Sequence, residues 1–118
     1  MSKKHLKSQG NVGEAKAILH YTEKGFIVSK PLFENAPYDL VVDTRKELLR
    51  VQVKTSEHQK GNGKYEVNLR VFGGNRSGIG KAKKLSEEVD VVFAVVGDGR
   101  IFELDAKPLH GKGRVRVG

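Results

Sequence analysis

Three polar residues, Asp39, Gln52 and Lys54, lie in two neighbouring segments whose compositions favour β-strands. If residues 44–47 form a four-residue loop between these segments, antiparallel pairing puts Asp39 directly opposite Gln52. Lys54 follows Gln52 by two positions and therefore projects from the same face of the strand. A carboxylate, an amide and an ammonium group would thus gather at one end of two paired strands.

Glu14 can add a second carboxylate to this group. It lies one turn before Ile18, at the edge of the apolar stripe of a predicted helix, so its side chain can lean over the sheet and stay charged. Two carboxylates suit Mg²⁺ or Mn²⁺, and the backbone carbonyl of Val53 or Gln52 and several waters could complete the coordination. Lys54 could position or deprotonate the attacking water and stabilise charge on phosphorus. This combination is typical of metal-assisted phosphodiester hydrolysis.

Capping residues and hydrophobic patterns predict the elements that would hold these residues. Asn11 can cap a helix that ends at Gly25. Its apolar positions recur at helical spacing: Val12, Ala15, Ile18, Leu19 and Thr22. Strands are predicted at 26–28, 38–43, 48–55, 65–70, 89–96 and 100–104, and a second helix at 79–88. We expect an α/β fold with a mixed β-sheet flanked by helices, in the core order αβββαβ, with 89–96 as a central strand buried on both faces.

Length and composition narrow the class of protein. The chain has 118 residues, 37% of them hydrophobic, which suits a single domain spanning residues 1–118. It contains no Cys, which excludes a disulfide framework, thiolate zinc sites and Cys nucleophiles. No apolar run approaches the ~20 residues of a membrane span, and no signal peptide follows the basic N-terminus. We therefore expect a cytoplasmic, nucleoid-associated protein without a membrane partner.

Positive charge is clustered along the chain. Lys and Arg number 22 against 14 Asp and Glu, a net charge of +8, and residues 70–84 and 107–118 contain no acid. Clustered cations favour a polyanion such as DNA because they release counterions from phosphates, although an ordinary basic surface has the same composition. We expect a loose basic arm at 1–10, a mobile loop at 56–63 and a basic tail at 107–118. The residues predicted to contact DNA are Lys7, His58, Lys60, Arg70, Arg76, Lys81, Lys83, Lys84, Arg114 and Arg116.

The Gly-rich segment 73–81 superficially resembles a phosphate-binding loop. Its spacing fails, and Ala82 stands where Ser or Thr is required, so we predict no nucleotide cofactor. A Gly-rich basic loop could instead approach a DNA backbone closely, and the alternative is a flexible turn. The four His residues are too scattered for a spaced metal motif, although His58 follows Lys54 closely enough to contact DNA.

Asp39, twelve intervening residues and then Gln52-Val53-Lys54, with Glu14 on a preceding helix, resemble the motif of the PD-(D/E)XK nuclease superfamily. The pattern more narrowly resembles the branch that contains bacterial group I intron homing endonucleases. That resemblance covers roughly residues 10–70 and rests on Lys24-Gly25-Phe26, Pro31, Asn35, Pro37-Tyr38-Asp39-Leu40-Val41-Val42-Asp43 and Arg50-Val51-Gln52-Val53-Lys54-Thr55. It implies a restriction-endonuclease-like core, metal ligation by Glu14, a central metal-bridging carboxylate at Asp39 and a catalytic lysine at Lys54.

Two positions depart from the superfamily pattern. Tyr38 directly precedes Asp39, and the proline lies one place earlier, at Pro37. Gln52 stands where most members have Asp or Glu, which removes one negative charge from the predicted metal site. The homing endonuclease branch resembles this glutamine form, so the substitution is compatible with activity.

We therefore predict a DNA endonuclease that depends on Mg²⁺ or Mn²⁺ and acts on duplex or branched DNA. Glu14, Asp39 and the carbonyl of Val53 would hold the metal, Gln52 would orient water or a ligand, and Lys54 would assist catalysis. A homodimer or homotetramer is expected, because one short chain carries a single site and two strands must be cut. Three alternatives stay open: a Holliday-junction resolvase that recognises branched shape, a non-catalytic DNA-binding module of the same fold, and a nuclease subunit of a larger assembly. A host, phage or intron origin fits each of them.

Overall fold

The computed structural model describes residues 3–71 and 83–118, with the backbone alone for residues 3–7. Within these ranges the chain contains one α-helix, α1 (Lys3–Glu23), and one short 3-10 helix, η1 (Lys107–Leu109). The strands are β1 (Ile27–Ser29), β2 (Leu40–Asp43), β3 (Leu48–Ser56), β4 (Gln59–Lys60), β5 (Lys64–Asn68), β6 (Val91–Val96), β7 (Ile101–Asp105) and β8 (Arg114–Val117).

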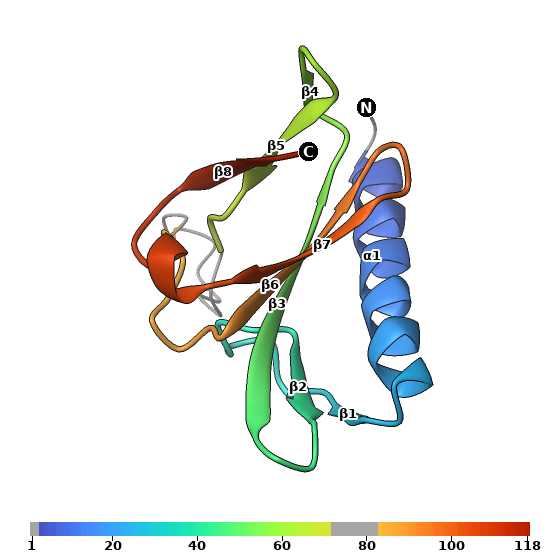
Figure 1. Cartoon of the computed structure of the whole chain (residues 1–118), viewed down its shortest axis with the longest axis vertical. Coiled ribbons are helices and arrows are strands. Elements are labelled where there is room, and N and C mark those ends of the chain that lie inside the picture. The colour runs from blue at the N-terminus through green and yellow to red at the C-terminus, as the bar shows by residue number, and fades with distance from the viewer. Residues whose placement is uncertain (1–2, 72–82) are drawn as a thin grey trace.

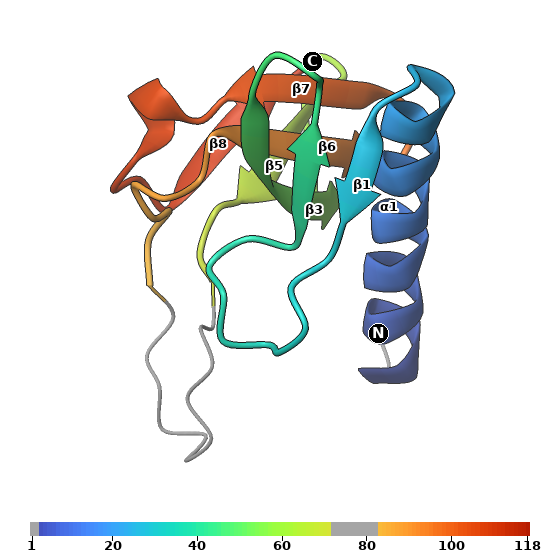
Figure 2. The ribbon, with the colours of Figure 1, turned by 90° about the horizontal axis from the view of Figure 1, so that it is seen from below.

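The strands form two sheets (Figure 1). The larger sheet has the order β1-β2-β3-β6-β7, in which β3 and β6 run parallel and the other neighbours run antiparallel. The smaller sheet, β4-β5-β8, is antiparallel. Helix α1 lies along one side of the larger sheet, and the smaller sheet lies on the other side (Figure 2). The mixed sheet and the α/β class agree with the sequence prediction.

Strand β6 lies at the centre of the core. On one face, Phe93 belongs to a buried cluster with Ala17 and Tyr21 of α1. On the other face, Val92 belongs to a second buried cluster with Val67 of β5. The strand is therefore covered on both sides, as its almost continuous apolar sequence predicts.

Helix α1 begins earlier than the sequence suggested. Residues 3–10, predicted as a loose arm, are helical, and Asn11 lies inside the helix instead of capping it. This segment is rich in Lys and contains no Pro, so nothing in it opposes helix formation strongly. The helix ends as predicted, because Gly25 adopts a φ of +82° and donates its N–H to the Thr22 carbonyl at 2.9 Å.

The face of α1 that meets the sheet also differs from the prediction. Val12 and Leu19 of the predicted apolar stripe are 53% and 57% exposed. The buried positions are instead Gly13, Ala17 and Tyr21, spaced four residues apart. Two small residues let the helix approach the sheet closely, and the Tyr21 ring supplies apolar area at the end of the contact.

The second predicted helix, at 79–88, is wrong where the structure describes it. Residues 83–86 are not helical and residues 87–88 form a turn, while residues 79–82 lie outside the described part. The N–H of Leu85 donates to the Lys112 carbonyl at 3.1 Å, and its carbonyl accepts from the Gly111 N–H at 2.9 Å. These tertiary hydrogen bonds, together with the burial of Leu85, use the groups that a helix would need.

The C-terminal segment 107–118 is ordered structure and not a tail. Strand β8 alternates exposed Arg with apolar Val, and it pairs with β5 so that Val117 lies opposite Tyr65 in the core. The predicted loop 56–63 likewise contains β4, which pairs with β5 across a turn. The turn at 97–99 leads into β7 as predicted. Within the described residues, no helix has the length and apolar character needed to cross a bilayer.

Candidate active site

The hairpin of β2 and β3 has the register that the sequence predicts. Residues 44–47 form the turn, and Asp43 pairs with Leu48. Asp39 is the residue before β2, and its backbone N–H donates to the carbonyl of Val51, the residue that pairs with Leu40, so the regular ladder ends here and Asp39 lies beside Val51 and Gln52. The two strands therefore bring a carboxylate and an amide together at the end of the hairpin that lies away from the turn.

Two hydrogen bonds fix Asp39 against β3. Its backbone N–H donates to the Val51 carbonyl at 2.8 Å, and its Oδ2 accepts the Val53 N–H at 2.8 Å. Burial raises the pKa of the Asp39 carboxyl, the hydrogen bond from Val53 lowers it, and the nearby Glu14 carboxylate raises it again. The Lys54 ammonium lowers it in turn. A divalent cation would counter the burial and favour the ionised carboxylate.

Lys54 extends from β3 into the same neighbourhood. Its Nζ donates to the backbone carbonyl of Arg70 at 2.5 Å. Burial lowers the pKa of the Lys54 ammonium, while the negative charge of Asp39 acts in the opposite direction. An amine with a lowered pKa exchanges its proton more readily near neutral pH than an exposed lysine does.

Glu14 reaches the site from α1 and carries a partner that the sequence did not reveal. Its Oε1 forms an ion pair with Lys30 Nζ at 2.5 Å, and its charge acts on Asp39. Ser29 of β1 pairs with Val41 of β2, so the register continues to bring Lys30 beside the start of β2. The sequence could have placed Lys30 near the site only through the pairing of β1 with β2. The long connection between these strands leaves the register of that pairing undetermined.

The donor set fits a hard divalent cation. Gln52 Nε2 donates to the Val53 carbonyl at 3.4 Å, but Gln52 Oε1 is buried and has no hydrogen-bond partner among the residues that the structure describes. An unpaired buried oxygen is costly, so a ligand that accepts its lone pair is expected. With the carboxylates of Glu14 and Asp39, these oxygens are the ligands that Mg²⁺ and Mn²⁺ prefer. The described residues contain no group of three or more His, Cys, Asp or Glu that could hold a metal, so a metal bound here would need amide or carbonyl oxygens beside the two carboxylates.

Gly13 sets the distance between α1 and β3 beside the site. A Cβ atom built on Gly13 would lie 2.3 Å from Cγ2 of Thr55, so no side chain fits there without movement. Because Glu14 is the next residue, a shift of the helix at this point would also move its carboxylate.

Replacing Gly13 by Ala is therefore expected to lower the free energy of unfolding by about 1–3 kcal/mol. Gly10 is the matched control, because it lies in the same helix and its Cβ would meet nothing within 4 Å. Gly10→Ala should raise the stability by about 0.5–1 kcal/mol through helix propensity alone. Urea unfolding measures both variants, and equal stabilities would contradict the close approach.

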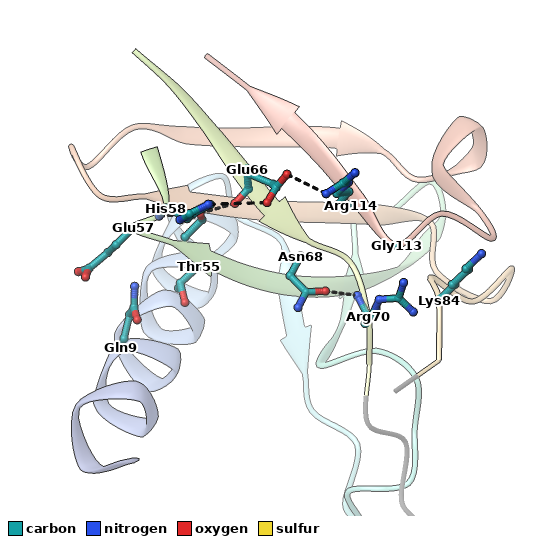
Figure 3. A pocket seen from close by; sticks show the side chains of 11 residues that line it. Gln9, Thr55, Glu57, His58, Glu66, Asn68, Arg70, Lys84, Gly113 and Arg114 are labelled. Carbon is teal, nitrogen blue, oxygen red and sulfur yellow. Dashed lines mark hydrogen bonds and ion pairs between the residues drawn. The ribbon is translucent and has the colours of Figure 1, made fainter. Parts of the chain in front are cut away.

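A groove with a volume of about 920 Å³ opens beside Thr55, the residue that follows Lys54 (Figure 3). It is lined by residues of α1, the end of β3, strand β5 and the start of β8. Four of the predicted DNA contacts line it: His58, Arg70, Lys84 and Arg114. Since the Arg70 carbonyl accepts from Lys54, the groove and the site share this residue.

Polar residues that the sequence did not indicate also line the groove. Glu66 lies 3.4 Å from Nη1 of Arg114 and 3.9 Å from Nε2 of His58, and Asn68 Oδ1 accepts the Arg70 N–H at 2.8 Å. The alternation of β5 points Glu66 and Asn68 away from the core, and β8 pairs beside them so that Asn68 lies opposite Arg114. A groove that combines cations, amides and a carboxylate can contact both phosphates and base edges.

The remaining predicted DNA contacts are not brought into this groove. Lys60 of β4, Lys83 and Arg116 of β8 lie elsewhere. Arg76 and Lys81 lie outside the described residues, and so does the side chain of Lys7.

Comparisons with known proteins agree with this geometry. The sequence model of the PD-(D/E)XK endonuclease family matches residues 4–108. The fold is similar to the solved structure of a bacterial homing endonuclease, I-Ssp6803I, with a TM-score of 0.73 and 26% sequence identity, over 95% of this chain and 77% of that one. No curated protein sequence matches significantly. The matched segment contains Glu14, Asp39, Gln52 and Lys54.

Proposed function

The chain belongs to the PD-(D/E)XK endonuclease family, and from this premise we propose that it is a metal-dependent endonuclease that recognises a base sequence in duplex DNA. The observation that carries the proposal is that Asp39 and Lys54 lie close enough to interact electrostatically, at one end of the β2–β3 hairpin and next to a groove lined by cations. The similarity to a homing endonuclease over almost the whole chain favours the homing or restriction type over other nucleases.

In this proposal, Glu14, Asp39, Gln52 Oε1 and the Val53 carbonyl hold Mg²⁺ or Mn²⁺. The bound ion supplies Lewis-acid stabilisation of the charge that develops on the phosphate. Asp39 stays ionised and orients the attacking water, for which its hydrogen bond from Val53 provides a fixed position. The Lys54 amine takes or shares a proton of that water, or donates to the developing oxyanion, after it leaves the Arg70 carbonyl.

The groove provides the DNA contacts. Arg70, Lys84 and Arg114 are proposed to bind phosphates along the backbone, and Asn68 is proposed to reach a base edge. Each copy of the chain would carry one such active site, whereas duplex DNA has two strands to cut. We therefore propose a homodimer or homotetramer, in which symmetry-related sites cut the two strands.

A cleavage screen tests the proposal. The purified protein is incubated with a plasmid library of random inserts and with a synthetic four-way junction, in Mg²⁺, Mn²⁺ or EDTA, and the cut ends are sequenced. Metal-dependent cuts at a shared insert sequence are expected. Cutting of the junction alone would replace this proposal with a nuclease that recognises branched shape. Binding without any cutting would point to a non-catalytic DNA-binding module.

Arg70→Ala is expected to weaken duplex binding by about fivefold or more, because one charge-assisted phosphate contact is lost. The slope of log K against log salt should decrease by about one unit, while the backbone carbonyl that accepts from Lys54 remains. Fluorescence anisotropy over a range of KCl concentrations measures both quantities. Lys46→Ala removes an equal charge from the turn at the far end of the hairpin and should change neither. An unchanged slope for Arg70→Ala would remove it from the interface.

A further inference from the structure

Lys30 forms an ion pair with Glu14, one of the proposed metal ligands. It follows β1, and its Nζ lies 2.5 Å from Glu14 Oε1. Lys30 therefore places a positively charged side chain in direct contact with the Glu14 carboxylate.

The two side chains of this ion pair differ in solvent exposure. The Lys30 side chain is 62% exposed, whereas the Glu14 side chain is only 24% exposed. The carboxylate is fixed at the surface of α1, and the lysine can leave it without losing buried contacts. Exposed ion pairs are weak, so a competing ion or phosphate can separate this one.

A metal ion and Lys30 compete for the Glu14 carboxylate. The ammonium occupies a lone pair that coordination needs, and its positive charge repels a divalent cation at the same carboxylate. A DNA phosphate beside the site offers Lys30 an alternative acceptor of the same charge as Glu14. Transfer of Lys30 to that phosphate would release Glu14 when DNA is bound.

We propose that Lys30 is a positioning residue that occupies Glu14 until DNA arrives and then binds a phosphate, so that metal and DNA bind cooperatively. This inference rests on the proposed metal site and assigns Lys30 a role at it. Cooperativity is reciprocal, so the same exchange makes the bound metal strengthen DNA binding.

Isothermal titration with Mn²⁺ alone, at constant ionic strength and without DNA, tests the first half. Lys30→Gln is expected to bind Mn²⁺ about five- to tenfold more tightly than the wild type, because a competing charge is removed. Lys30→Arg keeps the charge and should retain the wild-type affinity. Lys24→Gln is the matched control, because Lys24 pairs with Glu103 at 3.6 Å and its loss changes the net charge equally.

Equal Mn²⁺ affinities for Lys30→Gln and Lys24→Gln would overturn the inference and leave the metal site standing. The absence of Mn²⁺ binding in every variant would overturn both the inference and the metal-dependent function. Thermal unfolding in EDTA checks that Lys30→Gln folds, which its exposure predicts.

Binding of a 30-bp duplex in EDTA tests the second half. Lys30→Gln should bind the duplex at least about threefold more weakly than Lys24→Gln, since one phosphate contact is lost beyond the change in net charge. Equal duplex affinities of these two variants would exclude the transfer of Lys30 to a phosphate.

Discussion

Replacing Lys54 by Met is expected to reduce the rate of DNA cleavage by about a thousandfold, the size typical of a lost general acid or base. Methionine keeps most of the side-chain volume but removes the ammonium. Its apolar end suits the buried surroundings that lower the pKa of Lys54. Single-turnover cleavage under saturating protein separates this loss of chemistry from a loss of binding.

The control for Lys54→Met is Lys46→Met in the exposed turn of the same hairpin, which should cleave at the wild-type rate. Duplex affinity of Lys54→Met should stay within about threefold of the wild type, because the groove cations are unchanged. A rate within tenfold of the wild type would remove Lys54 from the chemistry. Loss of both binding and cleavage would instead indicate that its hydrogen bond to Arg70 shapes the groove.

The predicted site residues of the β2–β3 hairpin lie close together in the sequence. Asp39, Gln52 and Lys54 lie within sixteen positions, and one four-residue turn decides their register. Side-chain alternation then puts Gln52 and Lys54 on one face of β3, so local sequence is sufficient to bring these residues near one another. Strand β6 was predictable from local sequence as well, because a nearly continuous run of apolar β-formers is typical of a strand buried on both faces.

Packing between distant segments of the chain could not be predicted from local sequence patterns. Hydrophobicity singled out Val12 and Leu19 of α1, but the sheet contacts Gly13 and Ala17, because close approach depends on small size. The predicted phase of the helix was therefore wrong, although Glu14 still lies beside the contact line. Helix patterning is informative about burial only when large apolar residues make the contact.

The C-terminal segment illustrates a second limit. Alternation of Arg and Val in β8 is compatible with a strand, but its partner β5 is almost fifty residues away. Without that partner, the basic composition suggested a tail. The groove has the same origin, since Arg114 reaches Glu66 only after β8 has paired with β5. Recognition surfaces built from such long-range pairing are not apparent in local patterns.

Asp39→Asn is expected to reduce cleavage by at least about a hundredfold, since a bound metal loses a charged ligand, and at the same time to stabilise the metal-free protein. Burial raises the pKa of Asp39 in the folded chain, so the folded state binds this proton more tightly than the unfolded state does. Stability therefore falls as the pH rises from the ordinary carboxyl pKa to the raised value, and at neutral pH the ionised carboxylate carries that cost. Asn removes the charge, and its Oδ1 can still accept the Val53 N–H.

The melting temperature in EDTA at pH 7 should thus be about 2–4 °C higher for Asp39→Asn than for the wild type. Mn²⁺ should raise the melting temperature of the wild type and leave that of Asp39→Asn almost unchanged, because ligand binding stabilises only a site that binds it. Asp43→Asn is the matched control, since Asp43 accepts the Arg45 N–H at 2.8 Å at the other end of β2 and should alter neither cleavage nor the response to Mn²⁺. Loss of cleavage with a lower melting temperature would mean that Asp39 holds the hairpin together. A higher melting temperature would identify it as a residue that the fold keeps at a cost in stability, because the metal requires its charge.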